Sequence, residues 1–478
     1  MTAQTILPAN SAASGGFDVA NSVRMNRGST DHLRRTNNTG ETSNKIGTYS
    51  GWLKRSTIAL DGMMFEGKDL DANNYTQIYF QATGKLTVYG SGTMDIVSTA
   101  LFRDPTAWYH VCVAIDTTQG TAANRVKIYV NGVQVTSLTN GNGDGVEYPD
   151  QNDVIYFAVN GDQQAIGIRE DGALLWNGYF SEVVYIDGTQ LTPTSFGEFD
   201  EDSGIWKPIK VSGLTFGNNG CYLDFQDSSA LGNVVAGRTA VDFTVTNLTA
   251  VDQSTDTCTN NFATLNPLMP LGSNITYSDG NLTITPGTSD YKTTASTIAV
   301  SSGKWYAEFK AVSGHNGSTD VSIGIVGADT FLASTGSKAM SAYTNAFSYG
   351  SGGLVKQYNN STIRTDATYT NDDIIGIAVD MDNLKLYWSK NGSFQNSGDP
   401  TSGASGTGAV AITAGQPYYI CATTISSGGV KIFSANFGSP PYSESGGETD
   451  GDGYGNFAHA VPSGYFALNT KNLAEYGG

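Results

Sequence analysis

Some acidic side chains stand at an alternating spacing that could support acid–base chemistry. In the run EFDED, an extended chain would place Glu198, Asp200 and Asp202 on one face. Retaining glycoside hydrolysis needs two carboxyl groups about 5 Å apart. However, the run follows Pro193 and precedes Gly204, so we interpret it as a loop. We therefore predict no catalytic site in this run.

The other residue types that carry catalysis are not grouped either. The sequence holds no HExxH motif, no P-loop and no Ser–His–Asp order. Its His residues stand singly, and its four Cys residues show no CxxC spacing. Two of them, Cys112 and Cys421, lie in apolar strand-like runs, so we expect buried free thiols and no disulfide framework. The sequence thus predicts a protein that is not an enzyme.

Composition indicates an all-β protein with many turns. The 478 residues include 58 Gly, 25 Tyr and 20 Phe, only 15% are charged, and helix-period stretches are scarce. The net charge of −18 argues against nucleic acid and anionic membrane surfaces as partners, because phosphate binding requires a basic face. We therefore expect partners of another kind.

Nothing in the sequence predicts membrane insertion or export. No run of about 18 apolar residues occurs. The stretch MTAQTILPANSAAS lacks the basic and apolar regions of a secretory signal. We therefore expect synthesis in a reducing cytoplasm.

Two distant stretches predict the same hairpin. In VKIYVNGVQV, apolar residues alternate around Asn131-Gly132, and LKLYWSKNGSF repeats the pattern around Asn391-Gly392. Asn-Gly favours a type I′ turn, in which both central residues need positive φ. Each hairpin follows a strand-like run that ends in Asp, AWYHVCVAID and DIIGIAVDMD. One fold used twice explains this repetition.

Turn signals divide the chain into four parts. Strand-like runs at the spacing of a β-sandwich fill 21–197 and 271–478, and residues 1–20 form an N-terminal arm. Residues 198–270 hold short strands and too many aromatics for a flexible linker. We predict two jelly-roll β-sandwiches joined by this ordered connector, with a C-terminal segment closing the second.

Both modules resemble known families. The runs FRDPTAWYHVCVAID, RVKIYVNGVQV and GYFSEVVYIDG resemble the laminin-G/pentraxin-like branch of the concanavalin A-like lectin sandwiches. The runs GKWYAEFKAV, SIGIVGAD, SYGSGG, IIGIAVDMDNLKLYWSKNG and FSANFG follow the order of a SPRY domain. The resemblance implies two concanavalin A-like recognition folds. Some relatives are glucanases with an E-x-D-x-x-E strand, but Ser203 stands where the last Glu of that pattern would be.

The same resemblance implies Ca²⁺ as the cofactor to consider, because laminin-G and pentraxin-like domains bind it with loop oxygens. Such clusters also form ordinary turns, and this alternative stays open. The candidate ligands lie in three Asp/Asn/Gly loops: Asp69, Asp71, Asp144, Asp150, Asp450 and Asp452.

Recognition of a sugar would use an aromatic platform beside polar side chains. Trp176 precedes Asn177-Gly178, a turn where its ring would be exposed, whereas the strand patterns predict that Trp52, Trp108, Trp305 and Trp388 are core residues. The loop SYGSGGLVKQYNNS would belong to the SPRY partner surface. The predicted ligand-binding residues are Trp176, Asn177, Tyr148, Tyr358 and Asn359.

A second resemblance is to virion proteins of tailed bacteriophages, carried by NSVRMNRGSTDHLRRT, TYSGWLKRS, NNFATLNPL and PSGYFALNTKNL. It implies a structural tail-fibre or appendage protein located in the virion, bound to other virion proteins and contacting host surface glycans or receptors. A trimer is the homo-oligomer that the fibre resemblance implies. A capsid-decorating protein is the alternative, and a carbohydrate-active enzyme is a weaker one.

Overall fold

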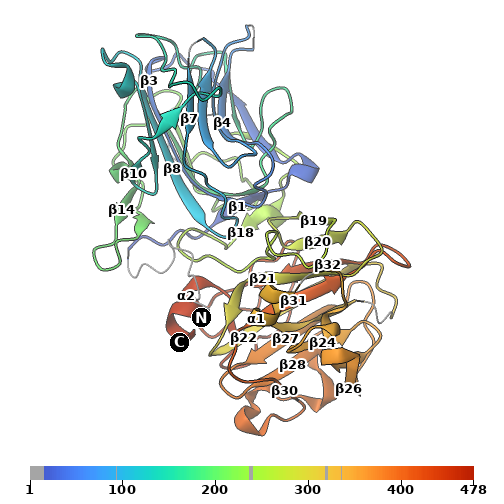
Figure 1. Cartoon of the computed structure of the whole chain (residues 1–478). Helices are drawn as coiled ribbons and strands as arrows, with labels where there is room; N and C mark the ends of the chain where they lie inside the picture. Colours follow the sequence, from blue (N-terminus) through green and yellow to red (C-terminus); the bar gives the residue numbers. More distant parts are fainter. Residues whose placement is uncertain are drawn as a thin grey trace. The chain divides into compact units, whose positions relative to one another are not determined.

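The computed structural model describes residues 16–70, 72–92, 94–235, 241–317, 321–334 and 336–477. The chain divides into two compact units, with the boundary between Thr259 and Asn260. Figure 1 shows both units, and each is described by itself below.

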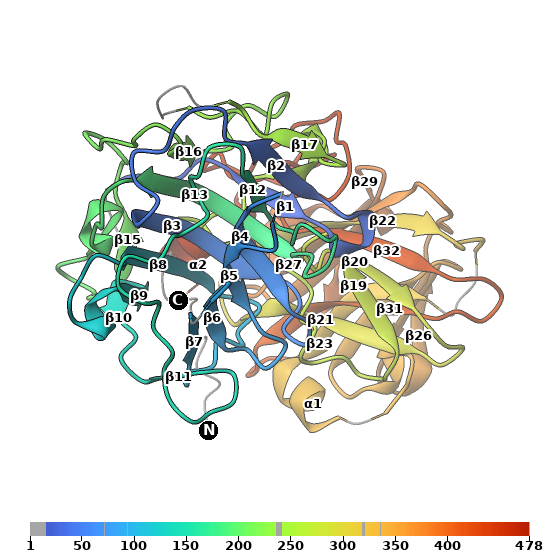
Figure 2. The ribbon, with the colours of Figure 1, turned by 90° about the horizontal axis from the view of Figure 1, so that it is seen from above.

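The first unit is built from two mostly antiparallel sheets that enclose one core. The first sheet has the order β10-β9-β8-β3-β13-β1-β18, with β16 paired to β13, and the second has the order β11-β7-β6-β5-β4-β12-β2-β17. Strands of the second sheet lie side by side in Figure 2. A short hairpin, β14-β15, stands apart. In chain order the strands are β1 (Ser22–Met25), β2 (His32–Thr36), β3 (Ile46–Arg55), β4 (Gly62–Lys68), β5 (Tyr75–Phe80), β6 (Leu86–Gly90), β7 (Asp95–Ser98), β8 (Trp108–Asp116), β9 (Val126–Val130), β10 (Val133–Gln134), β11 (Leu138–Thr139), β12 (Gln163–Ile166), β13 (Gly178–Asp187), β14 (Gly197–Phe199), β15 (Trp206–Pro208), β16 (Cys221–Leu223), β17 (Thr244–Thr246) and β18 (Gln253–Ser254).

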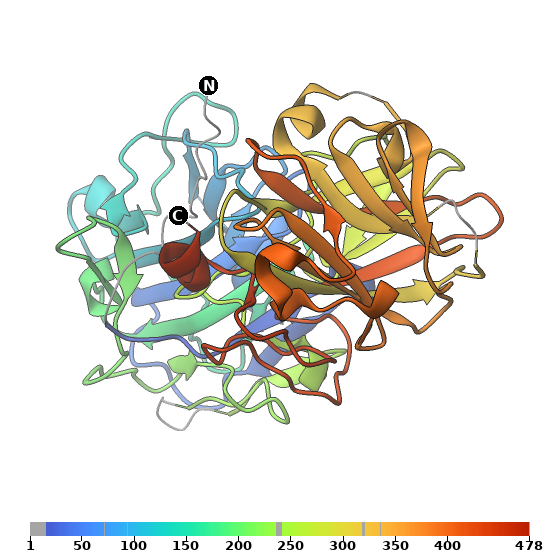
Figure 3. The same cartoon turned by 90° about the horizontal axis from the view of Figure 1, so that it is seen from below.

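The second unit is also a sandwich of two sheets. Its first sheet has the order β19-β20-β32-β22-β27-β28-β29, and its second has the order β21-β31-β23-β24-β25-β26. The short helix α2 is visible in dark red in Figure 3. The elements are β19 (Ile275–Ser278), β20 (Thr283–Pro286), β21 (Lys292–Val300), β22 (Lys304–Ser313), β23 (Ser322–Gly327), α1 (Ala328–Ala333), β24 (Ala346–Gly350), β25 (Leu354–Gln357), β26 (Ser361–Thr365), β27 (Ile374–Asp380), β28 (Lys385–Lys390), β29 (Ser393–Phe394), β30 (Val410–Ala411), β31 (Tyr418–Thr424), β32 (Ile432–Asn436), β33 (Phe466–Ala467) and α2 (Thr470–Tyr476).

The two sandwiches have the same strand order. The path β10-β9-β8-β3-β13-β1 in the first unit corresponds to β29-β28-β27-β22-β32-β20 in the second. In the other sheet, β7-β6-β5-β4-β12-β2 corresponds to β26-β25-β24-β23-β31-β21. The corresponding strands also follow each other in the same order along the chain. The predicted fold class, all-β with two jelly-roll sandwiches, is confirmed.

Both Asn-Gly hairpins form as the sequence predicts. Asn131 and Gly132 have φ of 48° and 77°, and Asn391 and Gly392 have φ of 48° and 78°. All four values lie in the left-handed region that a type I′ turn requires. The turns connect β9 to β10 and β28 to β29.

Alternation along the strands gives each sandwich its own buried core. The inward side chains of both sheets form one cluster in the first unit and another in the second. The four tryptophans predicted to lie in the core are buried, and all four cysteines are buried and free, as predicted.

Residues 198–270, the expected connector, are divided between the two units. Strands β16, β17 and β18 pair with β13, β2 and β1 of the first sandwich, and Trp206 joins a buried cluster with Trp52 and Trp108 on the outer face of its first sheet. Residues from Asn260 onward belong to the second unit, where Leu265 forms a β-bridge with Ser296. The described part of this segment is therefore packed structure, because its aromatic side chains cover a sheet face.

In the second unit, the segment after β32 likewise covers the outer face of a sheet. Phe457 and Tyr465 pack on Tyr306 and Tyr387, on the outer face of the sheet that contains β22 and β28. In both units, segments later in the chain thus cover part of the outer face of the first sheet.

Within the described residues, the structure has no helix that is both long and apolar enough to span a membrane.

Candidate functional site

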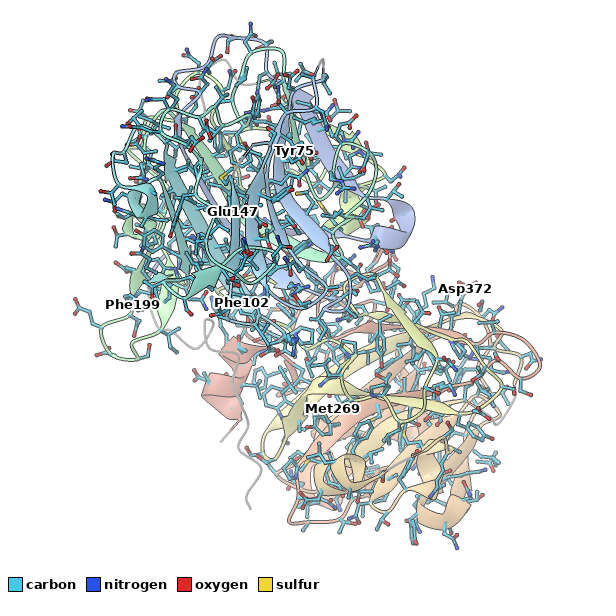
Figure 4. The ribbon with its side chains drawn as sticks, turned by 45° about the horizontal axis from the view of Figure 1, so that its top comes forward. Tyr75, Phe102, Glu147, Phe199, Met269 and Asp372 are labelled. Carbon is cyan, nitrogen blue, oxygen red and sulfur yellow. The ribbon has the colours of Figure 1, made fainter. Side chains whose placement is uncertain are left out.

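A cleft of about 340 Å³ lies on the outer face of the second sheet of the first unit. Its floor comes from β4, β5 and β6, and its wall comes from the loop after β12. Tyr75, labelled in Figure 4, is one of its lining residues. The lining residues are Asp61, Glu66, Lys68, Asn73, Tyr75, Gln77, Tyr79, Tyr89, Arg169, Glu170, Asp171 and Leu174.

A hydrogen-bonded acid–amide pair forms the floor of the cleft. Glu66 on β4 and Gln77 on β5 are directly opposite each other in the sheet register. The Gln77 Nε2 donates to Glu66 Oε1 at 2.6 Å, and the backbone N–H of Glu170 donates to Glu66 Oε2 at 2.6 Å. Glu66 is only 1% exposed. Both carboxyl oxygens are therefore fixed in position by the sheet and by the wall loop.

Burial sets the ionisation of Glu66. Loss of solvation raises its pKa to about 7, against the hydrogen bonds from Gln77 and Glu170, which favour the charged form. A carboxyl group with this pKa changes its charge near neutral pH, so any ligand contact with it depends on pH in that range.

Three tyrosines surround this pair. Tyr75, Gln77 and Tyr79 alternate along β5 and share the outer face, because side chains of a strand point to opposite faces in turn. Tyr89 lies opposite Gln77 on β6. The rings of Tyr75 and Tyr89 stack with their centroids 5.9 Å apart and their planes 26° apart. All three rings are half-buried, so part of each faces the cleft.

Two of these tyrosine hydroxyls, those of Tyr75 and Tyr79, stay protonated. Burial is the main cause that raises the pKa of Tyr75, and it raises the pKa of Tyr79 to about 12. Each hydroxyl is therefore a hydrogen-bond donor at neutral pH.

An ion pair within the loop after β12 shapes the wall. Arg169 donates from Nε and Nη2 to the two carboxylate oxygens of Asp171 at 2.9 and 2.7 Å. Arg34 on β2 holds the loop by donating to the carbonyl oxygens of Arg169 and Glu170, both at 2.9 Å. The wall is thus fixed to the sheet. Aromatic faces beside fixed polar groups are what a sugar requires of a binding site.

The predicted exposure of Trp176 is wrong. Its side chain is 1% exposed and packs in the first core against Phe80 and Phe180. The Asn-Gly that follows does not form a surface turn, because Gly178 begins β13. A Cβ on Gly178 would approach the Lys54 carbonyl oxygen to 2.1 Å. Glycine is therefore needed here for close packing of strands.

The next two predicted binding residues have structural contacts and do not line the cleft. Asn177 donates from Nδ2 to Thr57 Oγ1 at 2.6 Å, and its Oδ1 accepts from the backbone N–H of Arg27 at 3.4 Å. Tyr148 is half-buried against the first core.

The other two predicted binding residues lie in the turn between β25 and β26 of the second unit. Tyr358 is 54% exposed, and Asn359 has φ of 62°. The next residue, Asn360, lines a second cleft. The side chain of Tyr358 is therefore accessible to a ligand, and its ligand role stays a prediction.

The candidate calcium ligands of the first unit stabilise their own loops. Asp69 accepts from Ala72 N–H at 3.1 Å and from Asn74 Nδ2 at 3.2 Å. Asp144 accepts from Asn140 Nδ2 at 2.6 Å, and Asp150 is exposed. Asp71 lies outside the described residues.

In the second unit, Asp450 is a buried acceptor for loop and helix donors. It accepts from the backbone N–H groups of Asp452 (3.0 Å), Tyr454 (2.9 Å) and Ala467 (2.9 Å), and from Asn472 Nδ2 (2.8 Å). Asp452 is exposed. Among the described residues, no group of three His, Cys, Asp or Glu side chains could hold a metal ion, and calcium binding stays a prediction.

Sequence reasoning missed most of the cleft. The alternation in YTQIY predicts that Tyr75, Gln77 and Tyr79 share a face, and this signal could have been used. By contrast, no local pattern indicates that Arg169 lies beside Glu66, because a separate strand brings it there.

A comparison with family models agrees with the architecture of the first unit. Residues 27–194 match a laminin G family model described as the concanavalin A-like lectin/glucanases superfamily. The first sandwich therefore has a concanavalin A-like lectin fold, as predicted. A search of the curated proteins finds no match to this sequence.

Solved structures that match this chain include the SPRY domain of human HERC1, with 15% identity, 36% of this chain and 96% of that chain covered, and a TM-score of 0.29. The heptameric SAP-like pentraxin from Limulus polyphemus has 20% identity, coverage of 37% and 80%, and a TM-score of 0.26. The mouse laminin alpha1 chain domains LG4-5 have 13% identity, coverage of 88% and 86%, and a TM-score of 0.27. None of these findings links the chain to a bacteriophage, so that origin stays a prediction.

Proposed function

We propose that the chain is a lectin-like protein that binds glycans in the cleft over Glu66 and Gln77. The observation that carries this proposal is that three tyrosines, Tyr75, Tyr79 and Tyr89, surround that hydrogen-bonded pair. Aromatic rings contact the apolar faces of sugars, and fixed polar groups beside them select hydroxyl positions.

The charge of the lining favours neutral sugars. Four acidic residues, Asp61, Glu66, Glu170 and Asp171, line the cleft with only two basic ones, Lys68 and Arg169. This excess of negative charge would repel an acidic sugar, whereas it would not repel a neutral sugar.

The proposal is for binding without hydrolysis. A glycosidase needs one carboxyl group free to donate a proton and a second to attack or to activate water. Here Asp171 is held by Arg169 through two hydrogen bonds, and both oxygens of Glu66 already accept. In the acidic run after β13, Asp200 accepts from Ser203 and Lys207.

Binding measurements test the proposal directly. A glycan array followed by calorimetry should find a neutral oligosaccharide, and Tyr79→Ala and Tyr89→Ala should each weaken its binding about tenfold, or about 1.4 kcal/mol. Tyr358→Ala, a matched change in the other unit, should leave this affinity unchanged. Unchanged binding in both cleft variants would overturn the site, and release of reducing sugar would overturn the non-enzymatic role.

We further propose that this lectin-like protein works in a bacteriophage virion. In this role it is a tail-fibre or appendage protein that assembles with other virion proteins and contacts host glycans. The support is the sequence resemblance of NSVRMNRGSTDHLRRT, TYSGWLKRS and PSGYFALNTKNL to phage virion proteins. The alternative location is the capsid surface.

Immunogold electron microscopy on purified phage that encodes this chain tests the location. Label on the tail supports host recognition, and label over the head supports capsid decoration. No label on intact particles rejects the virion role and leaves the glycan-binding proposal standing.

A further inference from the structure

The second unit has a cleft of its own, of about 470 Å³. It lies on the outer face of β23, β24 and β25, which correspond in strand order to β4, β5 and β6. The two clefts therefore occupy the same sheet face of the same fold. The second is lined by Tyr291, Ser322, Ser337, Lys338, Ala339, Ser341, Ala342, Ser348, Gly350, Leu354, Lys356 and Asn360.

The charge of this lining is opposite to that of the first cleft. Lys338 and Lys356 are its charged residues, and the lining contains no carboxylate. Neither ammonium group forms an ion pair with any residue that the structure describes, although the chain carries 44 acidic residues against 26 basic ones. Two uncompensated cations at one hollow of an acidic protein attract an anion.

Hydroxyl groups form the floor between these cations. Ser348 pairs with Lys356 across β24 and β25, and Ser322 lies one strand further on. These two serines are 3% and 8% exposed, and neither Oγ has a hydrogen-bond partner in the described part of the chain. Both hydroxyls are therefore free to bond to a ligand that enters the cleft.

The rim is held in place by a hydrogen bond between its two segments. Ser341 Oγ donates to Asn360 Oδ1 at 2.7 Å. This contact joins the segment before β24 to the turn that carries the exposed ring of Tyr358. The geometry is therefore fixed before a ligand arrives, which lowers the entropic cost of binding.

We propose that this cleft is a second binding site, specific for an acidic saccharide. The carboxylate or sulfate of the sugar lies between Lys338 and Lys356, and its hydroxyls bond to Ser322 and Ser348. The site is independent of the neutral-glycan cleft in the first unit, so the chain holds two sites of opposite charge preference.

Calorimetry on the full chain tests this with a matched pair of ligands. The first is an α-1,4-linked galacturonic acid trisaccharide, and the second is its methyl ester, which keeps the ring and hydroxyls but loses the charge. A sulfated galactose trisaccharide distinguishes sulfate from carboxylate as the recognised group. We expect binding of one acidic ligand, at least tenfold weaker binding of the ester, and weaker binding as salt rises.

Variants locate the site. The double variant K338A/K356A should weaken binding of the acidic ligand about a hundredfold, and Ser348→Ala should weaken this binding several-fold. Lys385→Ala removes the same charge from β28 in the other sheet, and Tyr89→Ala alters only the first cleft, so neither should change this affinity. The melting temperature of each variant confirms that it is folded.

Several results would overturn the proposal. They are no binding of either acidic trisaccharide at millimolar concentration, equal binding in K338A/K356A, and tighter binding of a single-stranded oligonucleotide than of the saccharides. Loss of the neutral ligand alone would concern the first cleft and leave this site intact.

Discussion

Asn391 forms two hydrogen bonds with Ile374, and Asn131 forms the same two with His110 in the other sandwich. In each pair the Asn Oδ1 accepts from the partner's backbone N–H at 2.8 Å, and the Asn backbone N–H donates to the partner's carbonyl oxygen, at 2.8 Å for Asn391 and 2.9 Å for Asn131. The Asn side chain thus adds one hydrogen bond to the strand pairing at the point where the hairpin turn begins. Asn suits this position because it tolerates positive φ and its side chain supplies an acceptor.

The two Asn residues should respond differently to Asp. Asn131→Asp keeps the acceptor and tolerates positive φ, so its unfolding free energy should change by less than about 1 kcal/mol. Asn391 also donates from Nδ2 to Asp373 Oδ1 at 2.7 Å, so Asn391→Asp places two carboxylates together and should cost about 2 kcal/mol or more. Urea denaturation measures both, and equal costs would contradict this account of the second hairpin.

The contribution of three buried carboxyl groups to stability should fall as pH rises from about 5 to 8. Burial raises the pKa of Glu182 and Glu308 to about 7, as it does for Glu66. A carboxyl group with a raised pKa in the folded state binds its proton more tightly there than in the unfolded chain. Its contribution is complete below the ordinary pKa and is lost as pH passes about 7.

Glu182→Gln isolates one of these groups. The glutamine retains an acceptor for the Tyr222 hydroxyl, which bonds Glu182 Oε2 at 2.6 Å. The variant should be more stable than the parent at pH 8, by at most about 3 kcal/mol, with a smaller gain at pH 5. An unchanged pH dependence of the urea midpoint would show that Glu182 is ionised without cost in the folded chain.

Trp176 should affect stability because it is a core residue. Trp176→Ala removes a buried ring and should lower the unfolding free energy by about 3–5 kcal/mol, and Trp176→Phe should cost less. Fluorescence-monitored denaturation would be confounded by the lost tryptophan, so circular dichroism is the better measurement. A Trp176→Phe variant of unchanged stability that lost glycan binding would instead place this ring in a ligand site.

Asp450 should stabilise the second unit with or without calcium. Asp450→Ala leaves four donors without their acceptor and should cost about 3 kcal/mol or more. Asp452→Ala is the control, because that residue is exposed nearby. Neither EDTA nor 1 mM CaCl₂ (about the upper end of the dissociation constants of extracellular calcium modules) should shift the melting temperature, and a clear rise with CaCl₂ would support the calcium hypothesis.

The sequence predicted features that depend on local spacing. Asn-Gly specified both hairpins, and alternation identified the strands and the buried Trp52 and Trp388. The cleft depends on register between strands: Glu66 meets Gln77 across a bulged pairing, and the loop of Arg169 arrives from far along the chain. The same Asn-Gly dipeptide was misleading after Trp176, because there Gly178 serves close strand packing and no turn.

Chain beyond residue 194 completes the fold of the first sandwich, and this determines how the protein can be divided for expression. Asp256 neutralises the buried Lys54 at 2.8 Å and accepts from Trp108 Nε1 at 3.1 Å, and Trp206 covers the same face. A recombinant fragment that stops where the family match ends would expose this aromatic face and leave a lysine without its counter-ion. Such a fragment should aggregate, whereas one cut after Thr259 should stay soluble.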